Sequence, residues 1–270
     1  MLNKIKEAAQ SILARIDFEP EIGIILGTGL NSVAEMMTDP INIPYEDIPH
    51  MSVSTAPSHQ GRFVIGNLNG KNVLIMQGRL HYYEGYSMQQ ITFPIRVMRA
   101  LGINTLIVTN AAGSLNENLQ PGDIVLIKDH INFMGTNPLI GINYEELGER
   151  FPSMNEPYSH RLMNLATNIA QEHNFIVKTG VYTGLTGPSL ETLAECKMFA
   201  ALGSDLVGMS TVPEVIVAVH GGMEVLGISV VTNLSNIFHS EPHSQEEIRV
   251  NAEKARLNLE KIILNIIEKI

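Results

Sequence analysis

Short apolar runs alternate along the chain with longer segments in which apolar residues recur at helical spacing. The short runs predict buried strands at residues 22–26, 105–109, 123–127, 178–183, 205–207 and 224–231. The helical spacing predicts helices at about residues 2–16, 88–101, 159–173, 190–202, 213–220 and 244–270. Alternation of strands and helices favours an α/β domain built on a largely buried, mostly parallel sheet.

A tight hairpin is predicted between two further apolar runs that lie between Phe63 and Met76. Asn69-Gly70 joins these runs, and Asn-Gly flanked by apolar residues is a strong signal for a two-residue hairpin turn. The hairpin makes the predicted sheet mixed. No linker, repeat or low-complexity tract interrupts the chain, so we expect residues 1–270 to form a single domain with helices flanking the sheet.

One long segment, residues 136–158, lacks clear periodicity and contains three prolines. Loops of that length in a compact domain are usually functional. We therefore expect a functional loop here.

The formal net charge of −10 narrows the class of ligand. A chain this acidic is poorly suited to bind nucleic acid or anionic lipid over a broad surface, although a local pocket can still bind a small anion. No apolar stretch approaches the ~20 residues of a membrane span. No secretory signal precedes the first predicted helix, so we expect a cytoplasmic protein with small-molecule ligands.

The single cysteine, Cys196, excludes an internal disulfide and is expected to be a buried thiol.

Candidate chemistry gathers at the predicted strand ends, which is where ligands bind in sheets of this kind. The residues after each strand are small, polar or charged. These segments are Gly27-Thr28-Gly29-Leu30, Gln77 to Gly85, Thr109 to Ser114, Thr186 to Thr192, Gly208 to Thr211, and Thr232 to Ser235.

Several familiar motifs are incomplete. Gly27-x-Gly29 lacks the third glycine of a dinucleotide fingerprint because Ser32 stands in its place. A glycine-rich turn that offers backbone amides and a hydroxyl to an anion is the better interpretation. His239 and His243 are four residues apart, but the intervening Pro242 disfavours a helical metal pair. We therefore expect no metal and no cofactor.

Arg79 and His81 follow an apolar strand, and alternation directs both side chains to the same side. Arg79 could simply pair with an acid such as Glu84, since structural Arg–carboxylate pairs are common. Alternatively, the two residues form an anion clamp, completed by the hydroxyls of Thr28 and Ser210 and by amides near Ala111.

Four motifs, in this order along the chain, resemble the trimeric class of purine nucleoside phosphorylases. The resemblance runs from about Ile22 into the final helix. It implies a homotrimer that cleaves purine nucleosides with inorganic phosphate as co-substrate and needs no cofactor. The motifs are Gln77-Gly78-Arg79-x-His81-x-Tyr83-Glu84-Gly85-Tyr86, Thr109-Asn110-Ala111-Ala112-Gly113, Gly187-Pro188-x-x-Glu191-Thr192 and Val207-Gly208-Met209-Ser210-Thr211-Val212-Pro213-Glu214.

The resemblance assigns residues to phosphate and ribose. Those matching phosphate contacts are Thr28, His59, Arg79, His81, Ala111 and Ser210. For His59, a solvent-exposed loop histidine is an equal alternative. Tyr83 and Met209 match ribose contacts, and Phe151 matches an aromatic that reaches the ribose of a neighbouring subunit. Gln245 stands where the family usually has a histidine that touches the sugar 5′-hydroxyl, and His243 is an alternative for that role.

Glu191 and Asn233 match the pair that binds the base, with Leu190 in place of a phenylalanine beside it. Asn233 can donate to purine N7 as negative charge develops there, and Glu191 can accept from the N1–H of a 6-oxopurine. The resemblance thus implies catalytic roles for Asn233, Glu191 and His81, and a preference for inosine and guanosine. Glu191 is also a helix first-turn acid, which the helix dipole favours. A methylthioadenosine phosphorylase, a non-catalytic purine or phosphate binder, and a nicotinamide-dependent reductase are the alternatives.

Overall fold

The fold is organised around one sheet. The computed structural model describes residues 1–27, 32–56 and 60–270, with only the backbone of Gln245. Within them the strands form a nine-stranded sheet in the order β2-β3-β4-β1-β5-β8-β7-β6-β9. The strands are β1 Ile22–Leu26, β2 Thr38–Pro44, β3 Arg62–Leu68, β4 Lys71–Gln77, β5 Thr105–Ser114, β6 Ile124–Asn132, β7 Lys178–Gly184, β8 Leu206–Gly208 and β9 Glu224–Leu234.

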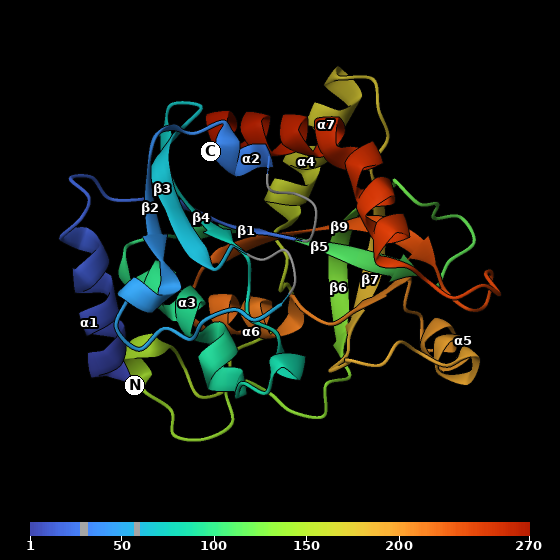
Figure 1. Cartoon of the computed structure of the whole chain (residues 1–270), viewed down its shortest axis with the longest axis horizontal. Helices are drawn as coiled ribbons and strands as arrows, with labels where there is room; N and C mark the ends of the chain where they lie inside the picture. The colour runs from blue at the N-terminus through green and yellow to red at the C-terminus, as the bar shows by residue number, and fades with distance from the viewer. Residues whose placement is uncertain (28–31, 57–59) are drawn as a thin grey trace.

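Helices cover both faces of this sheet (Figure 1). Helices α4 and α7 pack together on one face, and α1, α3 and α6 lie on the other. None of the helices in the described part of the chain combines the length and apolarity that a bilayer span requires. The helices are α1 Leu2–Leu13, α2 Ser32–Glu35, α3 Met88–Ala100, α4 His160–Glu172, α5 Leu193–Ala201, α6 Val212–His220 and α7 Gln245–Lys269, with short 3-10 turns at Tyr45–Asp47, Tyr82–Glu84 and Glu145–Leu147.

The end of the sheet closes on itself, a feature that the sequence did not predict. β5 pairs with β8 and also with β9, so that β5, β8, β7, β6 and β9 form a continuous ring of strands. β9 runs parallel to β5 and antiparallel to β6. Closure leaves no strand of this ring at an open edge, which satisfies backbone groups that such an edge would expose.

The predicted hairpin is confirmed. Lys71 of β4 pairs with Leu68 of β3 in antiparallel register. Asn69 and Gly70 between them both have positive φ, 54° and 87°, as the predicted type of turn requires. β2 adds an antiparallel strand beyond β3 that was not predicted, because its Pro40 and Pro44 are atypical of strands.

The predicted ends of three strands were too early. β5 continues to Ser114, β6 to Asn132 and β9 to Leu234. The small and polar residues that extend β5 have low strand propensity, but their backbones pair with β9, and tertiary pairing overrides local preference. The helix predicted from Leu190 begins instead at Leu193, where Thr192 caps it.

A bulge in the β5–β9 pairing changes the facing of the last residues of β9. Ala112 pairs with Val231 and Gly113 with Asn233, so Thr232 is an extra residue on β9. An extra residue reverses which face of the sheet the subsequent side chains occupy. The bulge therefore sets the direction of Asn233.

The core is aliphatic and includes the inner face of α7. Leu259 is 1% exposed there, whereas Leu257 on the same helix is 60% exposed. Cys196 is buried as expected, and burial raises the pKa of its thiol, which keeps it protonated.

The burial of α7 predicts a large difference between two leucine truncations. Leu259→Ala should lower the free energy of unfolding by about 2–5 kcal/mol, because it removes a buried side chain and leaves a cavity. Leu257→Ala is the matched control and should change stability by under ~0.5 kcal/mol. Urea unfolding of both variants measures the effect, and equal losses would contradict the orientation of α7.

Candidate active site

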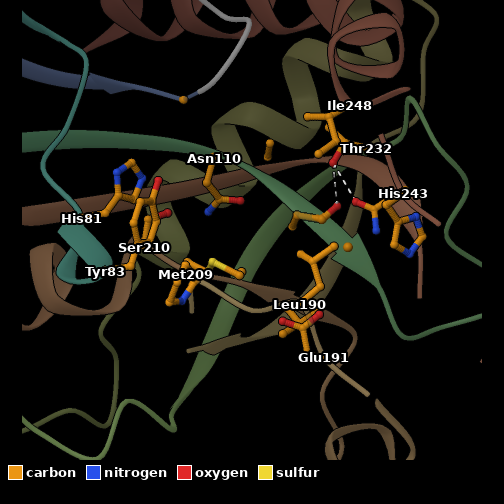
Figure 2. A pocket seen from close by; sticks show the side chains of 18 of the residues that line it. His81, Tyr83, Asn110, Leu190, Glu191, Met209, Ser210, Thr232, His243 and Ile248 are labelled. Carbon is orange, nitrogen blue, oxygen red and sulfur yellow. Dashed lines mark hydrogen bonds between the residues drawn. The ribbon is translucent and has the colours of Figure 1, made fainter. Parts of the chain in front are cut away.

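A cavity of about 410 Å³ opens where β4, β5, β8 and β9 end and α7 begins. In Figure 2, His81, Tyr83 and Ser210 lie at one end of it. Leu190, Glu191 and His243 lie at the other end, and Asn110 lies between. The sequence-predicted site residues that line the cavity are Arg79, His81, Tyr83, Ala111, Leu190, Glu191, Met209, Ser210 and Asn233.

Four sequence-predicted residues are not among these. Thr28 and His59 lie outside the described residues. Gln245 is the first residue of α7 and follows Ser244, which lines the cavity. Phe151 is 85% exposed and lines a separate depression on the surface.

Arg79 is the main cation of the cavity lining, and its side chain is 2% exposed. Nη1 donates to a carboxylate oxygen of Glu214 at 3.2 Å and to the hydroxyl of Thr211 at 3.4 Å. Nη2 donates to the backbone carbonyl of Thr109. The predicted alternative that Arg79 pairs with an acid is confirmed, but the acid is Glu214 and not the suggested Glu84. The guanidinium pairs with an acid from α6 instead, and these contacts hold its plane in one orientation.

Glu84 contacts His81. Its Oε1 accepts from the His81 backbone amide at 2.6 Å and lies 3.3 Å from His81 Nδ1. Oε2 accepts from the amide and hydroxyl of Thr55 at 2.6 and 2.7 Å. Burial alone would raise the pKa of Glu84, but hydrogen bonds from His81 and Thr55 outweigh it and lower the pKa to about 2. Because a carboxylate only accepts, Nδ1 of His81 is the donor in this contact.

A buried hydroxyl network connects this end of the cavity to α6. Thr211 Oγ1 accepts from Asn110 Nδ2 at 2.9 Å and lies 3.2 Å from Ser210 Oγ. The backbone of Thr211 has φ 74° and ψ −54°, and the Val212 amide donates to the Ser210 carbonyl at 2.8 Å. This is the rarer, strained form of γ-turn. A positive φ is unusual for a β-branched residue.

The opposite end carries Glu191. Burial raises the pKa of its carboxyl, and the neighbouring Glu195 adds to the effect. Its backbone carbonyl accepts from Asn236 Nδ2 at 2.7 Å, which ties the segment before α5 to the end of β9. The result is a partly buried carboxyl, held at one edge of the cavity, that can accept a hydrogen bond from a ligand.

Asn233 follows the bulge in β9. The hydroxyl of Thr232 donates to Asn233 Oδ1 at 3.1 Å (dashed in Figure 2) and approaches the carbonyl of Ala112 at 3.3 Å. Occupying Oδ1 in this way makes the other end of the amide, Nδ2, the hydrogen-bonding group available to a ligand. Nδ2 lies above Gly113, where a Cβ would come within 3.2 Å of it. A glycine at 113 therefore leaves room for the amide.

His243 lines the cavity beside Ser244. Its side chain is 9% exposed, its ring stacks on His239 at 5.1 Å, and its Nδ1 lies 3.6 Å from a Glu247 carboxylate oxygen. At that distance the contact is an ion pair at most and not a hydrogen bond. His243 therefore borders the cavity, as its predicted alternative role requires.

Several other lining residues had no predicted role, among them Asn110, Val207, Thr232 and Ile248. Asn110 lies within a motif and Thr232 directly precedes Asn233, so proximity to predicted site residues was the available signal. Ile248 follows the helical spacing of α7, and its pattern is that of an ordinary core residue.

The chain resembles proteins of one family over almost its whole length. A family model described as the phosphorylase superfamily matches residues 21–268. Purine nucleoside phosphorylase 1 of Bacillus subtilis is 49% identical over 267 residues, which cover 99% of this chain and 98% of that protein. Purine nucleoside phosphorylase of Bos taurus is 42% identical over 265 residues, or 96% and 92% of the two chains.

Solved structures of purine nucleoside phosphorylases have the same fold as this chain. Isoform 2 of purine nucleoside phosphorylase from Schistosoma mansoni, in complex with cytosine and ribose-1-phosphate, has a TM-score of 0.95 at 42% identity and covers 99% and 96% of the two chains. A Schistosoma mansoni purine nucleoside phosphorylase in complex with inosine has a TM-score of 0.94 at 40% identity, with 100% and 97% covered. These comparisons confirm the α/β fold and the resemblance drawn from the motifs.

The contacts of Glu84 predict a pH-dependent stability effect. The pKa of about 2 lies below the ordinary 4.5, so the anionic contacts stabilise the fold above pH 4.5 and are lost as the pH falls toward 2. Glu84→Gln should therefore lower the free energy of unfolding at pH 6, and the difference from wild type should narrow at pH 3.5. Urea unfolding at both pH values measures this, with the exposed Glu241→Gln as control. A difference that stays constant with pH would refute the assignment.

Proposed function

The chain belongs to the phosphorylase superfamily, and from that premise we propose that it catalyses the reversible phosphorolysis of purine nucleosides. The substrates are inosine, guanosine and their deoxy forms, and the products are the free base and (deoxy)ribose 1-phosphate. One observation carries the proposal: a single cavity holds a buried arginine with hydroxyls at one end, and a carboxyl with an amide at the other. An anion and a purine can therefore bind on either side of one sugar.

Phosphate binds at the Arg79 end, where Ser210, His81 and the Ala111 amide complete the site with Thr28 and His59. As the bond between the sugar C1′ and purine N9 breaks, positive charge develops on the sugar, and the adjacent phosphate stabilises it. A phosphate oxygen then forms the new bond to C1′. No covalent enzyme intermediate is required, so the protein acts through positioning and electrostatic stabilisation.

The electron pair of the broken bond enters the purine. Asn233 donates from Nδ2 to N7, where part of that negative charge accumulates. The departing base gains one proton in place of the sugar, which balances the proton that hydrogen phosphate loses on forming the bond to C1′. The contact from Thr232 to Oδ1 supports this direction of the amide. A donor aimed at charge that develops only in the transition state lowers the barrier more than it strengthens substrate binding.

Glu191 selects the base. N1–H of hypoxanthine and guanine donates a hydrogen bond to the carboxylate, whereas N1 of adenine is itself an acceptor. Unpaired acceptors facing each other are costly in a partly dry site, which favours 6-oxopurines. Asn233 argues against a methylthioadenosine phosphorylase, because relatives of that kind carry aspartate at this position. One Schistosoma mansoni relative has been crystallised with adenosine, so binding of an adenine nucleoside and its turnover must be measured separately.

Ribose binds between the two ends, beside Tyr83 and Met209, with Gln245 or His243 near its 5′-hydroxyl. Phe151 reaches the ribose of a neighbouring subunit in a homotrimer. Its 85% exposure, together with exposed Ile140 and Ile142 on the same loop, supports a surface that another subunit covers.

Release of hypoxanthine from inosine, measured with and without phosphate, tests the proposal. We expect release only with phosphate, and equal release in its absence would indicate a hydrolase.

Asn233→Ala should reduce kcat by at least about a hundredfold, the scale of losing one transition-state donor. Asn265→Ala, which removes an exposed amide from α7, is the matched control. Near-normal turnover of Asn233→Ala would refute the role of Asn233.

Subunit sharing can be tested by complementation. Phe151→Ala and Asn233→Ala should each lose activity, Phe151→Ala mainly through a higher KM for inosine. After the two are unfolded together and refolded, some sites combine an intact Phe151 with an intact Asn233, so activity should exceed the sum of the separately refolded variants. Sedimentation should give three chains per particle. A monomer, or a mixture with no gain in activity, would overturn the shared site.

A further inference from the structure

We propose that Thr211 is a positioning residue that directs the hydroxyl proton of Ser210 toward the bound phosphate. The inference rests on the proposed function, since it concerns the same anion site. Thr211 does not line the cavity and is fully buried, so it acts through its neighbours. Three residues contact its hydroxyl: Arg79 from the segment after β4, Asn110 from β5 and Ser210 from the segment before α6.

The donors and acceptors around Thr211 determine where its proton goes. A threonine hydroxyl has one proton to donate and two lone pairs that accept. Asn110 Nδ2, at 2.9 Å, and Arg79 Nη1, at 3.4 Å, can only donate, so they occupy both lone pairs. The proton of Thr211 is then left for Ser210 Oγ, at 3.2 Å.

Ser210 Oγ consequently accepts from Thr211 and keeps its own proton for another acceptor. Behind Ser210 lies the buried Tyr182 hydroxyl, which accepts from the Ser210 amide at 3.4 Å and also contacts the Ser210 side chain. Ser210 itself lines the cavity at the end that holds Arg79 and His81, and we assign its proton to an anion bound there, the stronger acceptor. With the roles reversed, Ser210 would donate to Thr211 and present lone pairs to the phosphate, which would repel it. The two donors behind Thr211 thus determine the direction of the whole chain of hydrogen bonds.

One further contact and the local backbone hold the Thr211 hydroxyl in position. Glu214 Oε1 accepts from the same Arg79 Nη1 at 3.2 Å, which fixes the nitrogen that faces the Thr211 hydroxyl. The strained γ-turn centred on Thr211 places its hydroxyl beside that of Ser210. Such backbone strain persists only where the surrounding contacts overdetermine it, and three hydrogen-bonding partners on one buried hydroxyl meet that condition.

The test measures binding of inorganic phosphate by calorimetry, with no nucleoside present. Thr211→Val keeps the shape but removes the hydroxyl, and should weaken phosphate binding by about 10- to 100-fold, the range for a hydrogen bond to a charged group. Thr211→Ser retains the hydroxyl and should restore binding to within about threefold of wild type. Thr92→Val removes another buried hydroxyl, bonded to the Met88 carbonyl, and should leave phosphate binding unchanged.

A double-mutant cycle shows whether Thr211 acts through Ser210. Once Ser210→Ala has removed the hydroxyl that Thr211 orients, adding Thr211→Val should weaken phosphate binding by no more than about threefold. In kinetics, Thr211→Val should raise the KM for phosphate and leave the KM for inosine within about twofold, a split that general unfolding of the site would not give.

Two results would overturn the inference: full additivity of the two substitutions, or equal losses in Thr211→Ser and Thr211→Val. If Thr211→Val does not fold, Thr211→Ala relieves the β-branched strain and provides the same contrast with Thr211→Ser. Wild-type protein that binds phosphate but releases no hypoxanthine would defeat the proposed function and leave this test intact. Wild-type protein that binds no phosphate would defeat the inference.

Discussion

The parallel pairing of β5 with β9 is the constraint on which the site depends. It carries residues of both ends of the cavity, since Asn110 and Ala111 lie on β5 and Asn233 lies on β9. The extra residue on β9, Thr232, supplies the bulge that redirects Asn233 and the hydroxyl that holds its amide. Loss of this register would separate the phosphate contacts from the base contacts, because each one-residue shift turns side chains to the other face.

Electrostatics impose a second constraint, because an acidic protein of net charge −10 has to hold an anion. Burying Arg79 alone would be costly, and Glu214 offsets that cost through a buried ion pair. The pair also balances the charge of Arg79 before phosphate arrives. Specificity for an anion then comes from oriented donors rather than from excess positive charge, which explains why the global charge does not forbid binding.

Much of this arrangement could be predicted from the sequence, for physical reasons. Buried strands and amphipathic helices have periodicities that depend on local burial, so their existence was predictable, as was the turn at Asn69-Gly70. The motifs named most of the residues around the cavity. The closed ring of strands could not be predicted, because the β5–β9 pairing joins residues far apart in the sequence, such as Thr105 and Glu224. The partner of Arg79 was missed for the same reason: Glu214 lies on a different element, whereas Glu84 was only near in sequence.

Several of the places where local preference failed share a location. Asn110 to Gly113 have weak strand propensity yet lie within a strand, and Thr211 is β-branched yet has a positive φ. Gly187 also has a positive φ, and a Cβ there would lie 2.2 Å from the sulfur of Met209. Asn110 to Gly113 line the cavity, and Thr211 and Gly187 are each next to a residue that lines it. A chain selected only for stability would avoid such conflicts, whereas one that must aim hydroxyls, amides and a carboxyl into a common space retains them and is stabilised elsewhere by its aliphatic core. The conflicts between local sequence and structure therefore mark the site independently of the motifs.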